Sequence, residues 1–155
     1  NLDQNNIATI RSGAFSSVTA NNIILTNNPV RQLDTYAFNS SRFQNINMGN
    51  HLITTLASYA FSNLIISGSL YLNNGPLSVI EKEAFINVYV GYMYLNNNQL
   101  TTITQPMFGP GCTVQGYLYL QNNGLRTVSV DAFANVTLRY IDLSSNSLTS
   151  YPLAL

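Results

Sequence analysis

The sequence predicts a solenoid of about seven short repeats with a parallel β-sheet along one side, and two regularities predict it. An apolar residue recurs at spacings of 23, 23, 24, 23, 25 and 23 residues, at Leu2, Leu25, Met48, Leu72, Leu95, Leu120 and Leu143. Phenylalanine follows with the same period, at Phe15, Phe38, Phe61, Phe85, Phe108 and Phe133. A fixed period in the twenties indicates one structural unit that is repeated and stacked.

The segment 93–108 shows the unit most clearly. Its sequence, MYLNNNQLTTITQPMF, follows the pattern LxLxxNxLxxIxxxxF. Met93 and Leu95 are separated by a single residue, and this alternation predicts a short strand with one buried face. One unit alone cannot bury that face. Successive strands are therefore expected to line up in a parallel sheet over a continuous core.

The pattern resembles the typical leucine-rich repeats of extracellular receptors, adhesion proteins and variable lymphocyte receptors, over essentially the whole chain. The resemblance implies a curved solenoid with short parallel strands on the concave face and an irregular convex side that has at most short 3₁₀ pieces. It also implies a single leucine-rich repeat domain spanning residues 1–155. Such repeats usually end in cysteine-rich caps. Cys112 is the only cysteine, so the domain is expected to lack N- and C-terminal caps.

Asparagine occupies one slot directly after the predicted strand in most units. We expect its side-chain amide to bond backbone groups of the adjoining turn that would otherwise be buried without partners. The asparagines of this ladder are Asn5, Asn28, Asn98, Asn123 and Asn146. His51 takes the slot in the third unit, where it is expected to replace asparagine as a hydrogen-bonding residue, and Gly75 takes it in the fourth. Asn97, one residue before the slot, is expected to face solvent and to tolerate alanine.

Three units carry a glycine shortly before the predicted strand, namely Gly68, Gly91 and Gly116. Glycine adopts left-handed backbone angles without a steric penalty. These three residues are therefore predicted to mark tight bends with special backbone angles.

The solvent-facing strand positions form the concave surface, which in leucine-rich repeat proteins is the usual ligand face. Tyrosines and amides predominate there: Tyr71, Tyr94 and Tyr119 form one column, Tyr92, Tyr117 and Tyr140 lie on the same face, and Asn73, Asn96 and Gln121 lie beside them. Rigid aromatics beside adaptable amides are typical of binding surfaces, and aromatic rings also suit stacking on sugars. The alternative is that tyrosine and asparagine simply form ladders that stabilise the sheet through cross-strand contacts.

Charged residues are scarce, because the formal net charge is zero and only 8% of the residues are charged. A nucleic-acid-binding protein needs a basic face, so nucleic acid is excluded as a partner. No apolar run approaches the roughly 18 residues that span a bilayer, so no direct membrane insertion is expected. The 6 acidic residues are spread around the solenoid without a nucleophile–histidine–acid set or a metal-ligand spacing. We therefore expect no catalytic residue, no metal, no cofactor and no enzymatic activity.

Two sequons for N-glycosylation, at Asn39 and Asn135, follow phenylalanines in segments that should be exposed. The neutral composition, rich in asparagine, serine and threonine, is common on extracellular proteins. Together with the resemblance, it favours an extracellular or cell-surface location.

Two functions remain open at this point. The first is a non-enzymatic recognition or adhesion module that binds a protein or a glycan through the concave tyrosine–asparagine surface. The second is a structural protein whose copies stack end to end into a filament or coat, because contacts between two different faces of one molecule can propagate without closing. The end faces would then be formed by Leu2, Ile7, Ile10 and Phe15 and by Ile141, Leu143, Leu148 and Tyr151.

Overall fold

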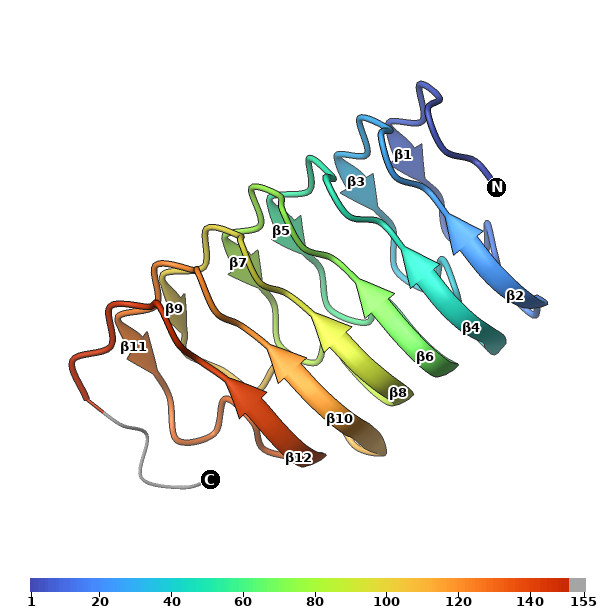
Figure 1. Ribbon diagram of the computed structural model, residues 1–155. Helices are drawn as coiled ribbons and strands as arrows, with labels where there is room; N and C mark the ends of the chain where they lie inside the picture. Colours follow the sequence, from blue (N-terminus) through green and yellow to red (C-terminus); the bar gives the residue numbers. More distant parts are fainter. Residues whose placement is uncertain (151–155) are drawn as a thin grey trace.

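The computed structural model describes residues 1–150, which form a parallel β-solenoid of about 6 turns. Figure 1 shows its two sides, with long strands in one row and short strands behind them. The long strands form one 6-stranded parallel sheet, the main sheet, in the order β12-β10-β8-β6-β4-β2. Their bounds are Thr19–Ile24 for β2, Ser41–Asn47 for β4, Phe61–Tyr71 for β6, Phe85–Tyr94 for β8, Cys112–Tyr119 for β10 and Val136–Asp142 for β12.

The other side of the solenoid consists of two-residue strands joined by turns. They pair in parallel, β1 with β3, β5 with β7 and β9 with β11. Their bounds are Thr9–Ile10 for β1, Gln32–Leu33 for β3, Thr55–Leu56 for β5, Val79–Ile80 for β7, Thr102–Ile103 for β9 and Thr127–Val128 for β11. Both sides advance by backbone-paired strands about 4.8 Å apart. The row of strands consequently runs nearly straight in Figure 1, and the curvature expected from the resemblance, with the sheet on a concave side, is not seen among residues 1–150.

The predicted solenoid with a parallel sheet is confirmed, with three differences in detail. Residues 1–150 contain no 3₁₀ piece, because the short strands take that side. The first unit contributes no strand to the main sheet, although the Leu2 N–H donates to the Ile24 carbonyl at 2.8 Å beside β2. The long strands also start well before the LxL motif. In β8 the buried residues Val88 and Val90 continue the alternation backward from Met93.

The core lies between the two sides and is filled by the two repeated apolar positions. The central members of the leucine column, from Leu25 to Leu120, are at most 2% exposed. The phenylalanines stack along the solenoid axis, with ring centroids of Phe38 and Phe61 5.7 Å apart and those of Phe61 and Phe85 5.4 Å apart. Phe61 and Phe85 are the first residues of β6 and β8, so this stack runs beneath the turns that lead into the main sheet.

The asparagine slot links each turn to the preceding one. The Asn98 side-chain nitrogen donates to the carbonyls of Leu72 and Leu95 at 2.8 and 3.0 Å, and its oxygen accepts from the Leu77 N–H at 3.2 Å. The same pattern of bonds recurs at Asn28, Asn123 and Asn146. Asn5 is exposed and bonds only carbonyls of its own turn within the described residues.

His51 takes the place of the ladder asparagine in the third unit, and it also bonds buried backbone groups, with a different geometry. Its Nδ1 accepts from the Ile53 N–H at 3.1 Å, so Nε2 carries the proton and donates to the Leu72 carbonyl at 3.2 Å. The ring reaches into the following turn, where a Cβ on Gly75 would lie 2.7 Å from Nδ1. The histidine of one unit and the glycine of the next are therefore complementary, because the imidazole fills the space that a side chain at Gly75 would need.

The prediction for the strand glycines is wrong. Gly68, Gly91 and Gly116 lie inside β6, β8 and β10, and none has a positive φ. They lie where the strand register shifts, between Ile66 and Ser69 in β6 and at matching points of the neighbouring strands. A Cβ there would collide: at Gly68 it would lie 2.5 Å from Asn45 Oδ1, and at Gly91 it would contact the Gly68 carbonyl oxygen. These glycines are needed for close approach at β-bulges.

Candidate binding surface

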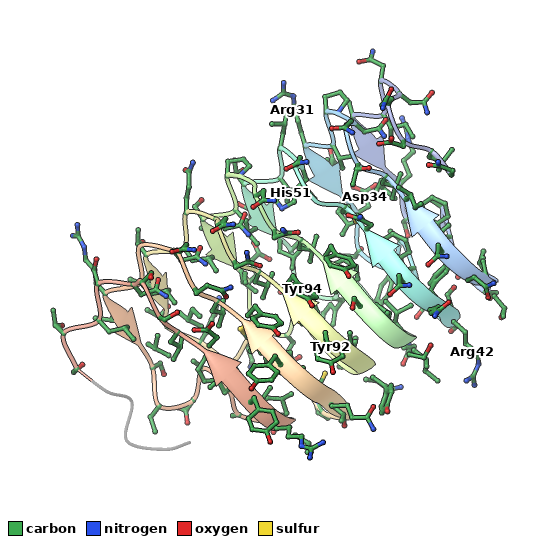
Figure 2. All side chains as sticks on the ribbon, viewed as in Figure 1. Arg31, Asp34, Arg42, His51, Tyr92 and Tyr94 are labelled. Carbon is green, nitrogen blue, oxygen red and sulfur yellow. The ribbon has the colours of Figure 1, made fainter. Side chains whose placement is uncertain are left out.

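The outer face of the main sheet carries the predicted tyrosines, and it is called the sheet face below. Backbone register pairs Asn47 with Tyr71, Tyr71 with Tyr94, Tyr94 with Tyr119 and Tyr119 with Asp142. Side chains alternate along a strand, so Tyr92 projects on the same side as Tyr94. Figure 2 shows both tyrosines over the front of the sheet.

The tyrosines form one continuous stack rather than two separate columns. Ring centroids are 4.6 Å apart for Tyr71–Tyr94, 4.6 Å for Tyr94–Tyr119, 5.3 Å for Tyr119–Tyr117 and 4.7 Å for Tyr117–Tyr140, with planes within 18° of parallel. The guanidinium of Arg139 lies 5.5 Å from the Tyr140 centroid at the end of the stack. These five tyrosines, called the tyrosine stack, fix one another's orientation across the four strands β6, β8, β10 and β12.

Tyr92 stands outside the stack. Its ring packs against Gly116 in the next strand, where a Cβ would lie 2.5 Å from a ring carbon. Tyr92, Gly91 and Gly116 line a hollow of about 260 Å³. Tyr117, Arg139 and Tyr140 also line this hollow. The glycines thus seat Tyr92 and leave bare backbone between the aromatic side chains.

The predicted amides lie beside the stack, at the ends of the strands. Asn73, Asn96 and Gln121 are half-buried. The side-chain oxygens of Asn96 and Gln121 are buried without a hydrogen-bond partner among residues 1–150. Neighbouring Asn97 is exposed and donates to the side-chain oxygen of Asn74 at 2.8 Å. This row therefore combines one exposed amide ladder with two carbonyl oxygens that have free hydrogen-bonding capacity.

The electrostatics of the sheet face are nearly neutral. Burial, followed by the neighbouring hydroxyls of Tyr119 and Tyr71, raises the pKa of Tyr94 above its ordinary value. The Tyr94 hydroxyl consequently stays protonated at neutral pH, where it both donates and accepts a hydrogen bond. A surface of this kind suits an uncharged, flat partner.

Sequence reasoning missed part of this surface because the strands start earlier than the motif. Tyr89 is exposed on β8, and its hydroxyl donates to the side-chain oxygen of Gln115 at 2.7 Å. Arg139 also went unnoticed. The apolar residues Val88 and Val90 could have identified Tyr89 between them, because they extend the strand pattern into this region.

The remaining predicted sites lie elsewhere. Asn135 is exposed in the turn before β12 with φ of 64°, and Asn39 is half-buried and accepts from the Asn63 amide at 2.9 Å. Cys112 is buried, its thiol donates to the Phe85 carbonyl, and burial raises its pKa, which favours the unreactive thiol.

The predicted end faces are only partly exposed. Ile10 is 3% exposed because it is the inward residue of β1, so its inclusion in an exposed face is wrong. Leu2 is exposed, and the half-buried members are Ile7, Phe15, Ile141, Leu143 and Leu148. Tyr151 lies outside the described residues.

Residues 1–150 hold no group of three or more His, Cys, Asp or Glu side chains arranged to hold a metal ion. The same residues include no helix with the length and apolar character needed to cross a membrane.

Comparison with known proteins places the fold in a family. The model of the BspA type leucine-rich repeat region matches in 6 copies, over residues 2–115 and 52–152. No curated protein matches the chain. The leucine-rich repeat assignment made from the spacing is confirmed, whereas the resemblance to receptor and lymphocyte-receptor ectodomains stays a prediction. Proteins with this type of repeat are often on the surface of bacteria or secreted by them. The repeated match covers nearly the whole chain, and the chain therefore belongs to the BspA-type leucine-rich repeat family.

Proposed function

We propose that the protein is a non-enzymatic recognition module that binds another protein through its sheet face. The leucine-rich repeat fold generally mediates protein binding, which supports the class of function. The tyrosine stack is the observation that supports the surface. Its rings are held in place before any partner arrives, so binding costs little side-chain entropy. Tyrosine is also enriched among the residues that contribute most to protein interfaces.

The stacking geometry favours a protein over a glycan on this face. Tyr94 has a neighbouring ring about 4.6 Å away on each side, so both of its ring faces are covered. Tyr117 is likewise stacked between Tyr119 and Tyr140. The stack consequently offers hydroxyls and ring edges to a partner, and not the open ring faces on which sugars pack. Hydroxyl and amide groups in this arrangement match the polar backbone and side chains of a protein surface.

An extracellular or surface location is part of the proposal. The family match supports it, and so does the neutral surface rich in asparagine. If the protein is made in a secretory pathway with N-glycosylation, Asn135 is the favoured site because it is exposed, whereas Asn39 is half-buried and hydrogen-bonded to Asn63. Neither sequon lies on the sheet face, so a sugar there leaves the proposed interface open.

The test is a binding screen against a panel of secreted and cell-surface proteins, with matched surface variants. We expect at least one partner to bind the wild-type chain and to lose affinity about tenfold or more with Tyr92→Ser plus Tyr140→Ser. The control is Val79→Ser, which removes a similarly exposed apolar side chain from the short-strand side. A partner that responds equally to both changes would argue against the sheet face.

Self-assembly by end-to-end stacking is the second candidate. It is favoured by the half-buried apolar residues of the outermost described turns, Phe15 at one end and Leu148 at the other among them. Sedimentation at rising protein concentration tests it. Growing oligomers that Leu148→Ser abolishes would support stacking, and a constant monomer mass would exclude it.

A further inference from the structure

A second aromatic hollow lies away from the sheet face, at the edge of the solenoid where the main-sheet strands begin (lower right in Figure 1). We propose that this hollow, the edge groove, binds a neutral sugar ring. Its volume is about 390 Å³, which lies within the usual range for a small-molecule site. The groove is lined by Tyr36, Tyr59, Ser62, Asn63, Ile86, Asn87, Pro110 and Gly111.

The two tyrosines of the edge groove differ from those of the sheet face in their stacking. Tyr36 and Tyr59 are 45% and 36% exposed, and their ring centroids are 6.2 Å apart with planes only 9° from parallel. Parallel rings at that distance are displaced sideways, so part of each ring face stays uncovered. The apolar C–H face of a pyranose packs on such an open aromatic face.

The backbone of these tyrosines is left-handed. Tyr36 and Tyr59 have φ of 62° and 60°, in the region that bulky residues rarely adopt. Gly13 and Glu83 hold the same slot in their own units, with φ of 74° and 55°. The left-handed conformation therefore belongs to this turn of the repeat, and a substitution at Tyr36 or Tyr59 has to tolerate it.

The asparagine side chains that line the groove are hydrogen-bonded to each other, and part of the hydrogen-bonding capacity of the polar lining is unused. Asn63 and Asn87 belong to an amide ladder, in which Asn87 donates to the Asn63 side-chain oxygen at 2.8 Å. A Cβ on Gly111 would lie 3.0 Å from Asn87 Oδ1, so the glycine leaves that oxygen uncovered. The Ser62 hydroxyl is buried and has no hydrogen-bond partner among residues 1–150. An unpaired buried hydroxyl is unfavourable, and a ligand hydroxyl entering the groove would relieve it.

The absence of charge among the lining residues selects a neutral ligand. The nearest carboxylate, that of Glu83, accepts from the Tyr59 hydroxyl at 3.3 Å, and its charge raises the pKa of Tyr59. A phosphate or an acidic sugar in the edge groove itself would therefore meet no cation among the lining residues and one nearby carboxylate. Pro110 and Gly111 also line the groove. They belong to the longest unit, in which Phe108 and Phe133 lie 25 positions apart in the sequence. The Asn87 N–H donates to the Pro110 carbonyl at 2.8 Å and holds this wall in place.

Beyond the amide ladder the edge groove continues into a second hollow of about 490 Å³, which shares Asn63, Asn87 and Gly111 with it. Arg42 and Tyr89 line its far side. Figure 2 shows Arg42 projecting from the start of β4 at this edge. The two hollows together have room for more than one sugar ring.

The test is saturation-transfer NMR followed by titration, with glucose, galactose, mannose, N-acetylglucosamine and their disaccharides as probes. The key variants are Tyr36→Asn and Tyr59→Asn, because asparagine removes the ring but tolerates the left-handed backbone. Each is expected to weaken binding of the recognised sugar about tenfold. Ser62→Ala is expected to weaken it about threefold, the effect of one hydrogen bond. Gly111→Asn, compatible with φ of 76°, should block the groove while every aromatic ring remains.

Tyr92→Asn is the matched control, since it removes an exposed tyrosine from the sheet face and should leave sugar binding unchanged. Each variant is compared with the wild type by circular-dichroism melting, and an identical curve shows that the variant is folded and suitable for the binding comparison. The proposal fails if the wild-type chain binds none of the neutral sugars at tens of millimolar. It also fails if Tyr92→Asn weakens binding as much as Tyr36→Asn, or if sialic acid or a proline-rich peptide binds the groove more tightly than every neutral sugar. Because these readouts do not involve a protein partner, they leave the sheet-face proposal to its own test.

Discussion

Left-handed backbone positions are one reason why the chain contains 22 asparagines. One such position recurs at the turn after each main-sheet strand, with φ between 53° and 62°, at Asn27, Asn50, Asn74, Asn97, Asn122 and Ser145. Asparagine tolerates this region better than other residues with a Cβ, since its short side chain bonds locally. The ladder asparagines lie at a different slot and serve buried backbone groups. The same turn therefore favours asparagine at two positions for two reasons, a left-handed backbone at one and unpaired backbone groups at the other.

Asn98 and Asn97 should respond differently to substitution. Asn98→Ala removes a side chain that bonds three buried backbone groups, so the free energy of unfolding should fall by about 1–3 kcal/mol. The sequence alone suggests that Asn97→Ala is harmless. Its φ of 55° implies instead a loss of about 1 kcal/mol, which Asn97→Gly should largely avoid. Urea titrations of the three variants measure this, and equal losses at Asn97 for alanine and glycine would contradict the backbone explanation.

His51 should make the stability of the fold depend on pH. Burial lowers its pKa below the ordinary 6.5, so the folded state resists protonation more than the unfolded state does. At low pH the unfolded chain then binds more protons, and stability falls as the pH drops below about 6.5 toward the folded pKa. Above 6.5 the histidine is neutral in both states and contributes no slope.

The measurement is the urea midpoint of unfolding between pH 7.5 and pH 5. The control is His51→Asn, which restores the residue found at this slot in other units and removes the titrating group. The wild type should lose stability across this range more steeply than the variant. Parallel curves would show that a group other than His51 governs the response.

At the scale of elements, a line of bulges crosses the main sheet and decides where the tyrosines point. Register shifts lie between Phe43 and Ile46 in β4 and at matching places in the strands that follow. The Asn45 side-chain oxygen accepts from the Ser69 N–H at 2.9 Å across this line, in place of a backbone partner. Tyr117 and Tyr119 both follow this line in β10 and lie two residues apart on one face, and their contact joins two tyrosine columns into one stack.

These bulges also mark the limit of what the sequence could predict. The period and the apolar alternation identify the leucine, phenylalanine and asparagine positions, because each obeys a burial rule that holds within one unit. The sequence shows glycine at positions 68, 91 and 116 but not the reason for it. Close approach of a neighbouring strand and a left-handed turn both favour glycine, and only the position of the neighbouring strand tells the two reasons apart. The edge groove is lined by Tyr36 and Pro110, which belong to units that are far apart in sequence, so no motif within one repeat predicts it.

Gly91 and Gly124 provide a matched pair for the bulge explanation. A Cβ on Gly91 would collide with the carbonyl oxygens of Ser67 and Gly68, which are backbone atoms that cannot rotate away. Gly91→Ala should therefore destabilise by about 1–3 kcal/mol or more. A Cβ on Gly124 meets nothing closer than 3.7 Å, so Gly124→Ala should change stability by less than about 1 kcal/mol. Thermal unfolding ranks the two, and the reverse order would refute the bulge geometry.

At the scale of the whole molecule, each turn contacts only its neighbours, so stability accumulates turn by turn along the axis. The phenylalanine stack is the clearest case. Phe85 lies fully buried between Phe61 and Phe108, whereas Phe15 is half-buried and stacks on Phe38 from one side. A change in a central turn disturbs two interfaces, and a change in the first described turn disturbs one.

Phe85→Ala should accordingly lower the free energy of unfolding by about 3–5 kcal/mol. Phe15→Ala should cost clearly less, because its ring is already partly exposed and has one described stacking neighbour. Denaturant unfolding of both variants of the 1–155 chain provides the comparison. Equal losses would mean that the chain unfolds as one block without the nearest-neighbour character of a solenoid.

Recognition through the sheet face is the central claim, and residue-resolved tyrosine modification tests it most directly. The chain is treated with a tyrosine-specific reagent, alone and bound to a partner from the protein panel, and mass spectrometry gives the modification rate of each tyrosine. The account predicts that the partner slows modification of Tyr92, Tyr117 and Tyr140 about tenfold or more and leaves Tyr36 and Tyr59 unchanged. Protection confined to Tyr36 and Tyr59, or protection of no tyrosine while the partner stays bound, would contradict it.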